Sequence, residues 1–463
     1  MNPALNNSSR NEAFSDAIRV LRACFEGLPT QSEMEALIED SRVAEQRGYY
    51  DPLEDDRLRD NYARYLGIRV SIWAIVQDLK PYYRQFSKAK TTSSPEVLQA
   101  FAIAFAGAEI IVKTGEHLIE LARKRDIVWK KLDEAEPRYG LKRKSFTRLY
   151  RQLTSPFRMR GFYQAVHYFD TNKAVVMEQL DSEWFQPVAK ILTSLNLPRV
   201  SRGDHLRRYS KFLGFSLRRR RLSSIHNLLF ATFEATGSDI AELRIPLVKA
   251  IDAPKRVTPN IVERLKPHLQ PGDVFITRHD DAMSNLFLPG FWPHGAFYIG
   301  GGSDREALGV GFASDGVTNT EQDGVVVLEA KKDGVLLRDL HDTLAIDSFV
   351  VLRPKLSSDD ITSAINRGLS HAGKLYDFVF DFSVSHRLVC TEVIYRAYHG
   401  VGPIRFDLSL KAGRYCLSAE DFLNQSIAKE WFEPVIICNV GNVEWAEGEK
   451  AREVLRGSFS ARF

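Results

Sequence analysis

The segment FWPHGAFYIGG, residues 291–301, combines the pattern of a buried strand with one ionisable side chain at its start. The run from Ala296 to Ile299 is apolar and is followed by three glycines, which is typical of a strand that enters a core. His294 comes just before this run. An imidazole at this place is either a structural histidine with hydrogen-bond partners or a group that takes part in chemistry.

After Pro271-Gly272 the sequence has the two-residue period of strands. Helical patterns follow at about 358–372 and from Cys390 to Gly400, a glycine suited to end a helix. We therefore predict an α+β domain in which an antiparallel sheet packs against a few helices. The predicted strands are DVFIT (273–277), HGAFYIG (294–300), GVVVLEA (324–330), GVLLRDL (334–340) and SFVVLRP (348–354).

The first half of the chain has the period of helices. Apolar residues recur at three- and four-residue spacing around 17–25 and 66–79, and Ser94-Pro95 is a suitable start for a long helix. Further helices are predicted at 157–180 and 217–235. We expect an all-helical region over 1–240, a linker over 241–267, the α+β domain over 268–445 and a C-terminal tail over 446–463.

The composition is that of a globular protein with two or three domains. The 463 residues are 44% hydrophobic and 26% charged, and 63 Lys and Arg against 59 Asp and Glu give a net charge of only +4. This balance does not call for nucleic acid, and we expect none as a partner. The four cysteines are widely and irregularly spaced, which argues against a metal site or a disulfide framework and suits a reducing compartment.

The location expected from the sequence is the cytoplasm. The N-terminal residues lack the features of a secretory signal, and the most apolar run, 100–108, is too short to span a membrane. Two basic blocks, at 138–160 and 199–221, suggest either solvated helix faces or peripheral contact with an anionic membrane. Solvated faces are the simpler interpretation, and membrane contact is favoured over nucleic acid because Leu and Phe accompany the charges.

Cys390 lies where the last predicted helix begins, after two apolar residues. The amides and the positive dipole end of a helix N-terminus lower the pKa of a thiol, so this cysteine is disposed toward thiolate. The Cys390 backbone amide, also at the helix start, is a candidate to stabilise an oxyanion. Cys24, Cys416 and Cys438 stand in apolar surroundings and are expected to pack in the core.

Thiol catalysis also needs an imidazole and a third polar group that orients it. His294 supplies the imidazole if the helix of Cys390 packs across the start of its strand. Glu329 is the favoured third group because it interrupts an apolar strand, where a half-buried carboxylate needs a partner. The alternatives for this third position are Glu321, Asp323 and Asp339.

Two other histidines are rival candidates. His386 precedes Cys390 by four residues, but Ser385 and Arg387 on either side suggest a surface turn. His279 is followed by Asp280 and Asp281, yet no second histidine stands at ligand spacing, so a solvated loop is the simpler interpretation. We expect no metal and no cofactor.

These motifs together resemble a known family. GDVFIT, the strand WPHGAFYIG, VLEA followed by GV, then YDF and CTEV occur in the order of the circularly permuted NlpC-type papain-like cysteine hydrolases, YiiX/YebB-like branch. The resemblance covers about residues 268–440. It implies that His294 is the base, Glu329 its orienting partner and Cys390 the nucleophile, and that Tyr376 lies near the thiol. Thr391 stands beside the nucleophile, where serine is common in the family, and is a further candidate for substrate contact.

The resemblance implies a cysteine hydrolase or acyltransferase that forms a thioester with an amide or ester substrate. Its relatives act on cell-wall peptides or on lipid and fatty-acyl compounds. Because no export signal is evident, we favour a small-molecule or lipid-like acyl substrate over a peptidoglycan peptide. The alternative from another class is a scaffold that binds a membrane or partner without turnover.

Overall fold

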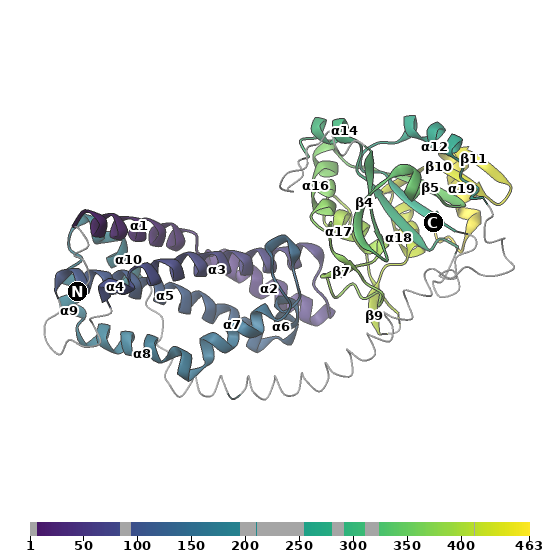
Figure 1. Cartoon of the computed structure of the whole chain (residues 1–463). Helices are drawn as coiled ribbons and strands as arrows, with labels where there is room; N and C mark the ends of the chain where they lie inside the picture. Colours follow the sequence, from purple (N-terminus) through teal and green to yellow (C-terminus); the bar gives the residue numbers. More distant parts are fainter. Residues whose placement is uncertain are drawn as a thin grey trace. The chain divides into compact units, whose positions relative to one another are not determined.

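The computed structural model describes residues 7–83, 94–194, 210, 254–279, 291–310, 324–411 and 413–463 (Figure 1). The chain divides into two compact units. The helical unit comprises Met1–Tyr50, Glu54–Asp133 and Arg143–Arg221, and the C-terminal unit comprises Asp51–Leu53, Glu134–Lys142 and Leu222–Phe463.

The first half of the chain is helical, as predicted. Helix α2 begins with a capping box in which Thr30 and Glu33 bond each other's backbone amides, and it ends at Gly48 in the left-handed conformation. The segment 217–235 lies outside the described residues. The α-helices of this half are α1 (Asn7–Glu26), α2 (Gln31–Arg47), α3 (Pro52–Asp78), α4 (Lys80–Tyr83), α5 (Pro95–Lys124), α6 (Asp126–Leu132), α7 (Ser145–Thr154), α8 (Pro156–Thr171), α9 (Lys173–Glu178) and α10 (Gln186–Ser194); two 3₁₀ turns are η2 (Pro137–Tyr139) and η3 (Glu183–Phe185).

Helix α5 forms the centre of the helical unit. Ser94 is its N-cap residue and Pro95 occupies its first turn, as the sequence predicts. By length and composition α5 is apolar enough to cross a membrane, so the short apolar run noted in the sequence understated it. Most of its apolar part is buried inside the unit, however, as in the core helix of a helical domain.

The C-terminal unit is built on an antiparallel sheet with the strand order β11-β10-β5-β1-β2-β3-β4. All five predicted strands are present. Two strands of this sheet, β10 and β11, were not predicted from the sequence; the strand pattern of β10 is broken by Pro434 and by a bulge between Pro434 and Ile436. The strands of this sheet are β1 (Val274–Arg278), β2 (His294–Tyr298), β3 (Val325–Lys331), β4 (Gly334–Asp339), β5 (Ser348–Pro354), β10 (Phe432–Val440) and β11 (Val443–Glu447).

Alternating strand residues bury opposite faces of this sheet. Val274 and Ile276 face a core formed with α16 (Ser358–Leu369), α17 (Cys390–Tyr398), α18 (Ala419–Ala428) and α19 (Gly448–Ser458). Phe275 faces the other core, with α12 (Pro259–Leu265) and α15 (Leu340–Thr343). The two faces explain why the strands read as nearly continuous apolar runs. The smaller elements are η4 (Lys266–His268), α14 (Gly302–Ala307), β6 (Leu375–Tyr376), β7 (Arg387–Leu388), β8 (Ser409–Lys411) and β9 (Arg414–Cys416).

The C-terminal unit is larger than the segment 268–445 that the sequence suggests. The expected linker contains α12, which buries Val262 and Leu265, and the expected tail contains α19, which buries Ala451 and Leu455. Both helices are short and amphipathic, so composition alone does not distinguish them from exposed segments. The unit also takes in 51–53 and 134–142 from the first half of the chain.

Candidate active site

His294 and Glu329 lie on neighbouring strands and are in direct contact. His294 is the first residue of β2, Glu329 lies in β3, and the two strands pair in antiparallel fashion. Nε2 of His294 is 2.7 Å from Oε1 of Glu329. The His294 side chain keeps 25% of its surface exposed and that of Glu329 only 1%, so the imidazole reaches solvent while its carboxylate partner is buried.

Three further side chains hold the Glu329 carboxylate. Thr343 donates a hydrogen bond to Oε2 at 3.2 Å, and Lys331 Nζ and Arg338 Nε lie 2.9 and 3.4 Å from the same oxygen. Burial by itself raises the pKa of Glu329, but the contacts with His294 and Lys331 outweigh it and lower that pKa below its ordinary value. Glu329 is therefore ionised at neutral pH. These three partners were not predicted from the sequence.

Cys390 is the first residue of α17, which packs directly on β2. Gly295 makes this close approach possible, because a Cβ atom there would meet Cδ1 of Ile394 at 2.7 Å. The backbone amides of Gly295 and Thr391 donate hydrogen bonds to the Cys390 sulfur. The start of α17 and the start of β2 are thus brought together.

The electrostatics of Cys390 and His294 favour a thiolate–imidazolium pair. Burial raises the pKa of the Cys390 thiol, but the His294 charge, its hydrogen bond and the two amides lower that pKa below its ordinary value. Burial lowers the pKa of His294, but the Cys390 thiolate and Glu329 together raise it to about 10. Each charge therefore stabilises the other.

The other cysteines have the opposite electrostatics. Burial raises the pKa of Cys24 on α1, of Cys416 on β9 and of Cys438 on β10, where the value reaches about 12. All four cysteines are free thiols. Cys390 alone among them is in a setting that favours thiolate.

Tyr376 and Thr391, the two expected substrate contacts, both lie beside the thiol. Tyr376 is on β6, and β6 pairs in parallel with β7, the strand that leads into Cys390. Burial, and after it the Cys390 charge, raise the pKa of Tyr376 well above its ordinary value, so the phenol keeps its proton. Thr391 is buried in the first turn of α17 and directs its amide at the sulfur.

The rival residues take other positions. Asp339 caps α15 by accepting a hydrogen bond from the His341 amide. His386 precedes β7, and the ring that pairs with Glu329 is that of His294. Glu321, Asp323, Asp280 and Asp281 lie outside the described residues. Within the described part of the chain, no group of three or more His, Cys, Asp or Glu side chains is placed to hold a metal ion.

A helix that presents a cysteine against the histidine of an adjacent antiparallel sheet defines the papain-like thiol hydrolases, and here the histidine comes first in the chain. Residues 268–426 match the family model Peptidase_C92, described as permuted papain-like amidase enzyme, YaeF/YiiX, C92 family. Over these residues the C-terminal unit is similar to the permuted papain-like amidases, a likeness that supports a thiol hydrolase in general. No curated protein and no solved structure matches the chain.

Proposed function

We propose that the C-terminal unit hydrolyses an amide or ester through a thioester on Cys390, with His294 as acid and base and Glu329 as its orienting partner. One observation carries this proposal. The buried Glu329 carboxylate bonds the His294 ring, and that ring stabilises the thiolate of Cys390, while the pKa values of the other three thiols are raised.

The reaction takes place in two stages. The Cys390 sulfur attacks the carbonyl carbon, and the His294 imidazolium gives its proton to the departing nitrogen or oxygen as the bond to carbon breaks. This leaves a thioester and a neutral imidazole. His294 then takes a proton from water, the hydroxide attacks the thioester carbon, and the acid leaves while the thiolate and imidazolium are restored. An acceptor other than water would give acyl transfer by the same steps.

Two donors are suited to the oxyanion that forms in each stage. The amide of Cys390 stands at the first position of α17, where helix amides have no partner in the preceding turn. Tyr376 holds a protonated hydroxyl beside the sulfur because burial and the thiolate raise its pKa. A neutral phenol can donate a hydrogen bond to the oxyanion without neutralising the thiolate.

An apolar acyl group is the substrate feature that the surroundings of the thiol favour. Tyr376 packs edge-on against Phe378 and Phe380, with ring centroids 5.0 and 6.3 Å away. Both phenylalanines are only partly buried, so an aromatic surface stands next to the nucleophile. This supports a lipid-like or N-acyl compound over a cell-wall peptide, which would need polar partners along its backbone.

We also propose that this activity belongs to the cytoplasm and that the helical unit meets an anionic membrane. Helix α7 exposes Lys144, Arg148 and Arg151 at intervals of one turn, and Phe157 at the start of α8 is 89% exposed. Cationic side chains beside an exposed aromatic fit a phospholipid surface. The second basic block, 199–221, lies almost entirely outside the described residues.

The pH dependence of alkylation at each cysteine, read by mass spectrometry, tests the proposed nucleophile. We expect Cys390 to react faster than Cys24, Cys416 and Cys438, with a midpoint below that of an ordinary thiol, and we expect this midpoint to rise in His294→Ala. Equal and slow labelling of all four cysteines would instead favour a binding scaffold without turnover. Protection of Cys390 by N-acyl amides of increasing chain length, but not by cell-wall peptides, would support the apolar acyl group.

A further inference from the structure

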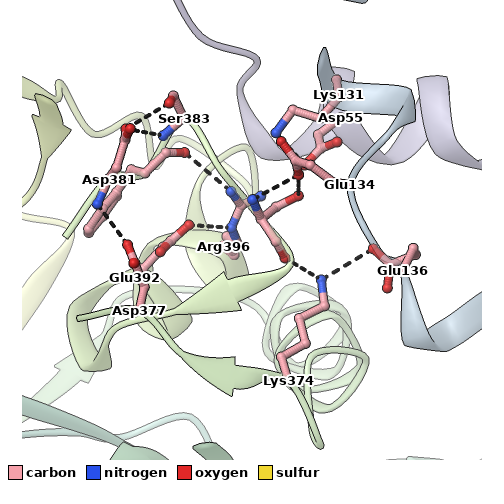
Figure 2. A network of polar contacts seen from close by, with 12 residues as sticks. Asp55, Lys131, Glu134, Glu136, Lys374, Asp377, Asp381, Ser383, Glu392 and Arg396 are labelled. Carbon is pink, nitrogen blue, oxygen red and sulfur yellow. Dashed lines mark hydrogen bonds and ion pairs between the residues drawn. The ribbon is translucent and has the colours of Figure 1, made fainter. Parts of the chain in front are cut away.

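A hairpin from the helical half of the chain is part of the C-terminal unit. The hairpin, residues 134–142, closes on itself through paired backbone hydrogen bonds between Glu136 and Leu141, with Gly140 in the left-handed conformation at the turn. Two acidic residues, Glu134 and Glu136, stand at its start, and Figure 2 shows both of them directed at the C-terminal unit's polar groups.

Glu136 forms a buried ion pair with Lys374. The Lys374 ammonium lies 3.2 Å from Oε2 of Glu136, and both side chains are at most 1% exposed. Arg138 of the same hairpin also contacts Oε2 of Glu136, at 3.1 Å. A charge pair in such a place is costly to break, because the partner left behind remains buried.

The same lysine and the same hairpin hold Ser385. Lys374 donates a second hydrogen bond to the Ser385 carbonyl at 2.9 Å, and the Ser385 amide and hydroxyl both donate to Glu134 at 3.1 Å. Every polar group of Ser385 is thus satisfied by Lys374 or by the hairpin. Ser385 is buried, so these contacts replace water.

These contacts lie just before β6 and β7, the two strands that position the thiol. Lys374 immediately precedes β6, which carries Tyr376, and Ser385 lies two residues before β7, which leads into Cys390. Other residues of the unit fix the rest of this loop. Asp377 accepts the amides of Val379 and of Asp381, the second of which Figure 2 shows, and Arg396 of α17 donates to the Phe382 carbonyl. The hairpin provides the remaining anchors.

We propose that Glu134, Glu136 and Lys374 are positioning residues of the thiol site, and that the first half of the chain sets the reactivity of Cys390 through this hairpin. This inference rests on the proposed function. Loss of either carboxylate frees the start of β6 or of β7. Tyr376 and the first turn of α17 are then no longer held in fixed positions relative to each other. The hairpin touches no reacting atom and acts through the strands.

The experiment compares the full-length wild type with Glu136→Gln, Lys374→Met and the double variant. The readouts are the rate and pH midpoint of Cys390 alkylation, with the three other cysteines in the same molecules reporting on global unfolding. We expect each single variant to slow Cys390 alkylation at least tenfold and to raise its midpoint. We expect the double variant to resemble the singles, because the two residues act as one pair.

Asp273→Asn is the matched control. Asp273, just before β1, forms another ion pair in the same unit, with Arg353 of β5 at 2.8 Å; its carboxylate is buried and Arg353 is partly exposed. The pair lies at the opposite end of β1 from Thr277, the residue that pairs with His294. Its loss should lower the melting temperature without changing the Cys390 midpoint. If Glu136→Gln behaves like Asp273→Asn, with lower stability and an unchanged midpoint, the inference is wrong while the proposed function stands.

Failure of the proposed function can be told apart from failure of this inference. If the proposed function is wrong, Cys390 is labelled slowly already in the wild type. Should Glu136→Gln or Lys374→Met prove insoluble, Glu134→Gln decides the matter, because it keeps the buried ion pair and weakens the bonds to Ser385. A raised midpoint in Glu134→Gln supports the inference, and a wild-type midpoint overturns it.

Discussion

At the scale of single residues, the site depends on the electrostatic attraction between the Cys390 thiolate and the His294 imidazolium. His294 keeps its proton up to a pH of about 10 because the Cys390 thiolate and the Glu329 carboxylate both favour the imidazolium. Cys390 keeps its charge at a pH where an ordinary thiol is neutral. The active form is therefore the ion pair, which exists between the lowered pKa of the thiol and the raised pKa of the imidazole.

This window predicts different pH profiles for alkylation and for hydrolysis. Alkylation needs only the thiolate, so its rate should rise as pH passes the lowered pKa of Cys390 and then stay level. Hydrolysis also needs the imidazolium as acid, so kcat/KM should fall again near pH 10. An alkaline limb near 6.5, the ordinary value for histidine, would contradict the assignment.

Substitutions at Cys390 and at Glu329 should lower the activity by different amounts. Cys390→Ala removes the nucleophile and should lower kcat on the order of 10⁴-fold or more, and activity that survives it would exclude the mechanism. Glu329→Gln keeps a hydrogen-bonding group and should cost roughly 10²-fold or less, since its role is to orient the ring. Circular dichroism of each variant checks that the fold is retained.

The pairing of His294 with Cys390 could be predicted from sequence because each stands at a recognisable local position, a strand start and a helix start. Glu329 could be predicted because a carboxylate interrupts an apolar strand. Its partners Lys331 and Arg338 could not, since charged residues at a hairpin normally face solvent and carry no signal of burial nearby.

At the scale of elements, the approach of α17 to β2 sets the distance between thiol and imidazole. Gly295 is the point of contact, where the side chain of Ile394 occupies the space that a Cβ atom would need. The glycine has no left-handed conformation to explain it, so its value here is its small size. A pattern of apolar residues predicts that a helix packs on a sheet. It does not predict which residue at the contact must be small.

Gly295→Ala should therefore force the Ile394 side chain to shift or α17 to move from the sheet. We expect a loss of about 1–3 kcal/mol in the free energy of unfolding, together with slower alkylation of Cys390. Gly295→Ala with Ile394→Val, which removes the overlapping Cδ1 atom, should recover much of both losses. Gly324→Ala is the matched control, because a Cβ atom there meets nothing within 4 Å; a similar loss in the control would exclude the steric explanation.

At the scale of the whole molecule, the C-terminal unit is not a continuous piece of chain. It includes the hairpin 134–142, and Leu53 packs so closely on Gly400 that a Cβ atom there would meet it at 2.4 Å. A change of period from helices to strands in the sequence indicates where the sheet of this unit begins. It gives no sign of segments that pair with residues more than two hundred positions away, because such pairing leaves no local pattern.

How far the hairpin contributes to the stability of the C-terminal unit can be measured by comparing the whole chain with the fragment 254–463. In the whole chain, Lys374→Met leaves Glu136 buried with fewer partners and should cost about 3–5 kcal/mol. In the fragment the carboxylate is absent, so the same substitution should be neutral or stabilising. Thermal unfolding of the four proteins gives the answer, and an equal loss in both backgrounds would show that Lys374 is stabilised by Ser385 alone.

The position of the hairpin in the chain also has a consequence for biosynthesis. Glu136 leaves the ribosome 238 residues before Lys374, and β10, which covers the free edge of β5, is made later still. Until then β5 presents an unpaired strand edge to the cell. The nucleophile acquires its full surroundings only after β10 has been made, so a chain terminated before Phe432 should carry Cys390 as an ordinary, unreactive thiol.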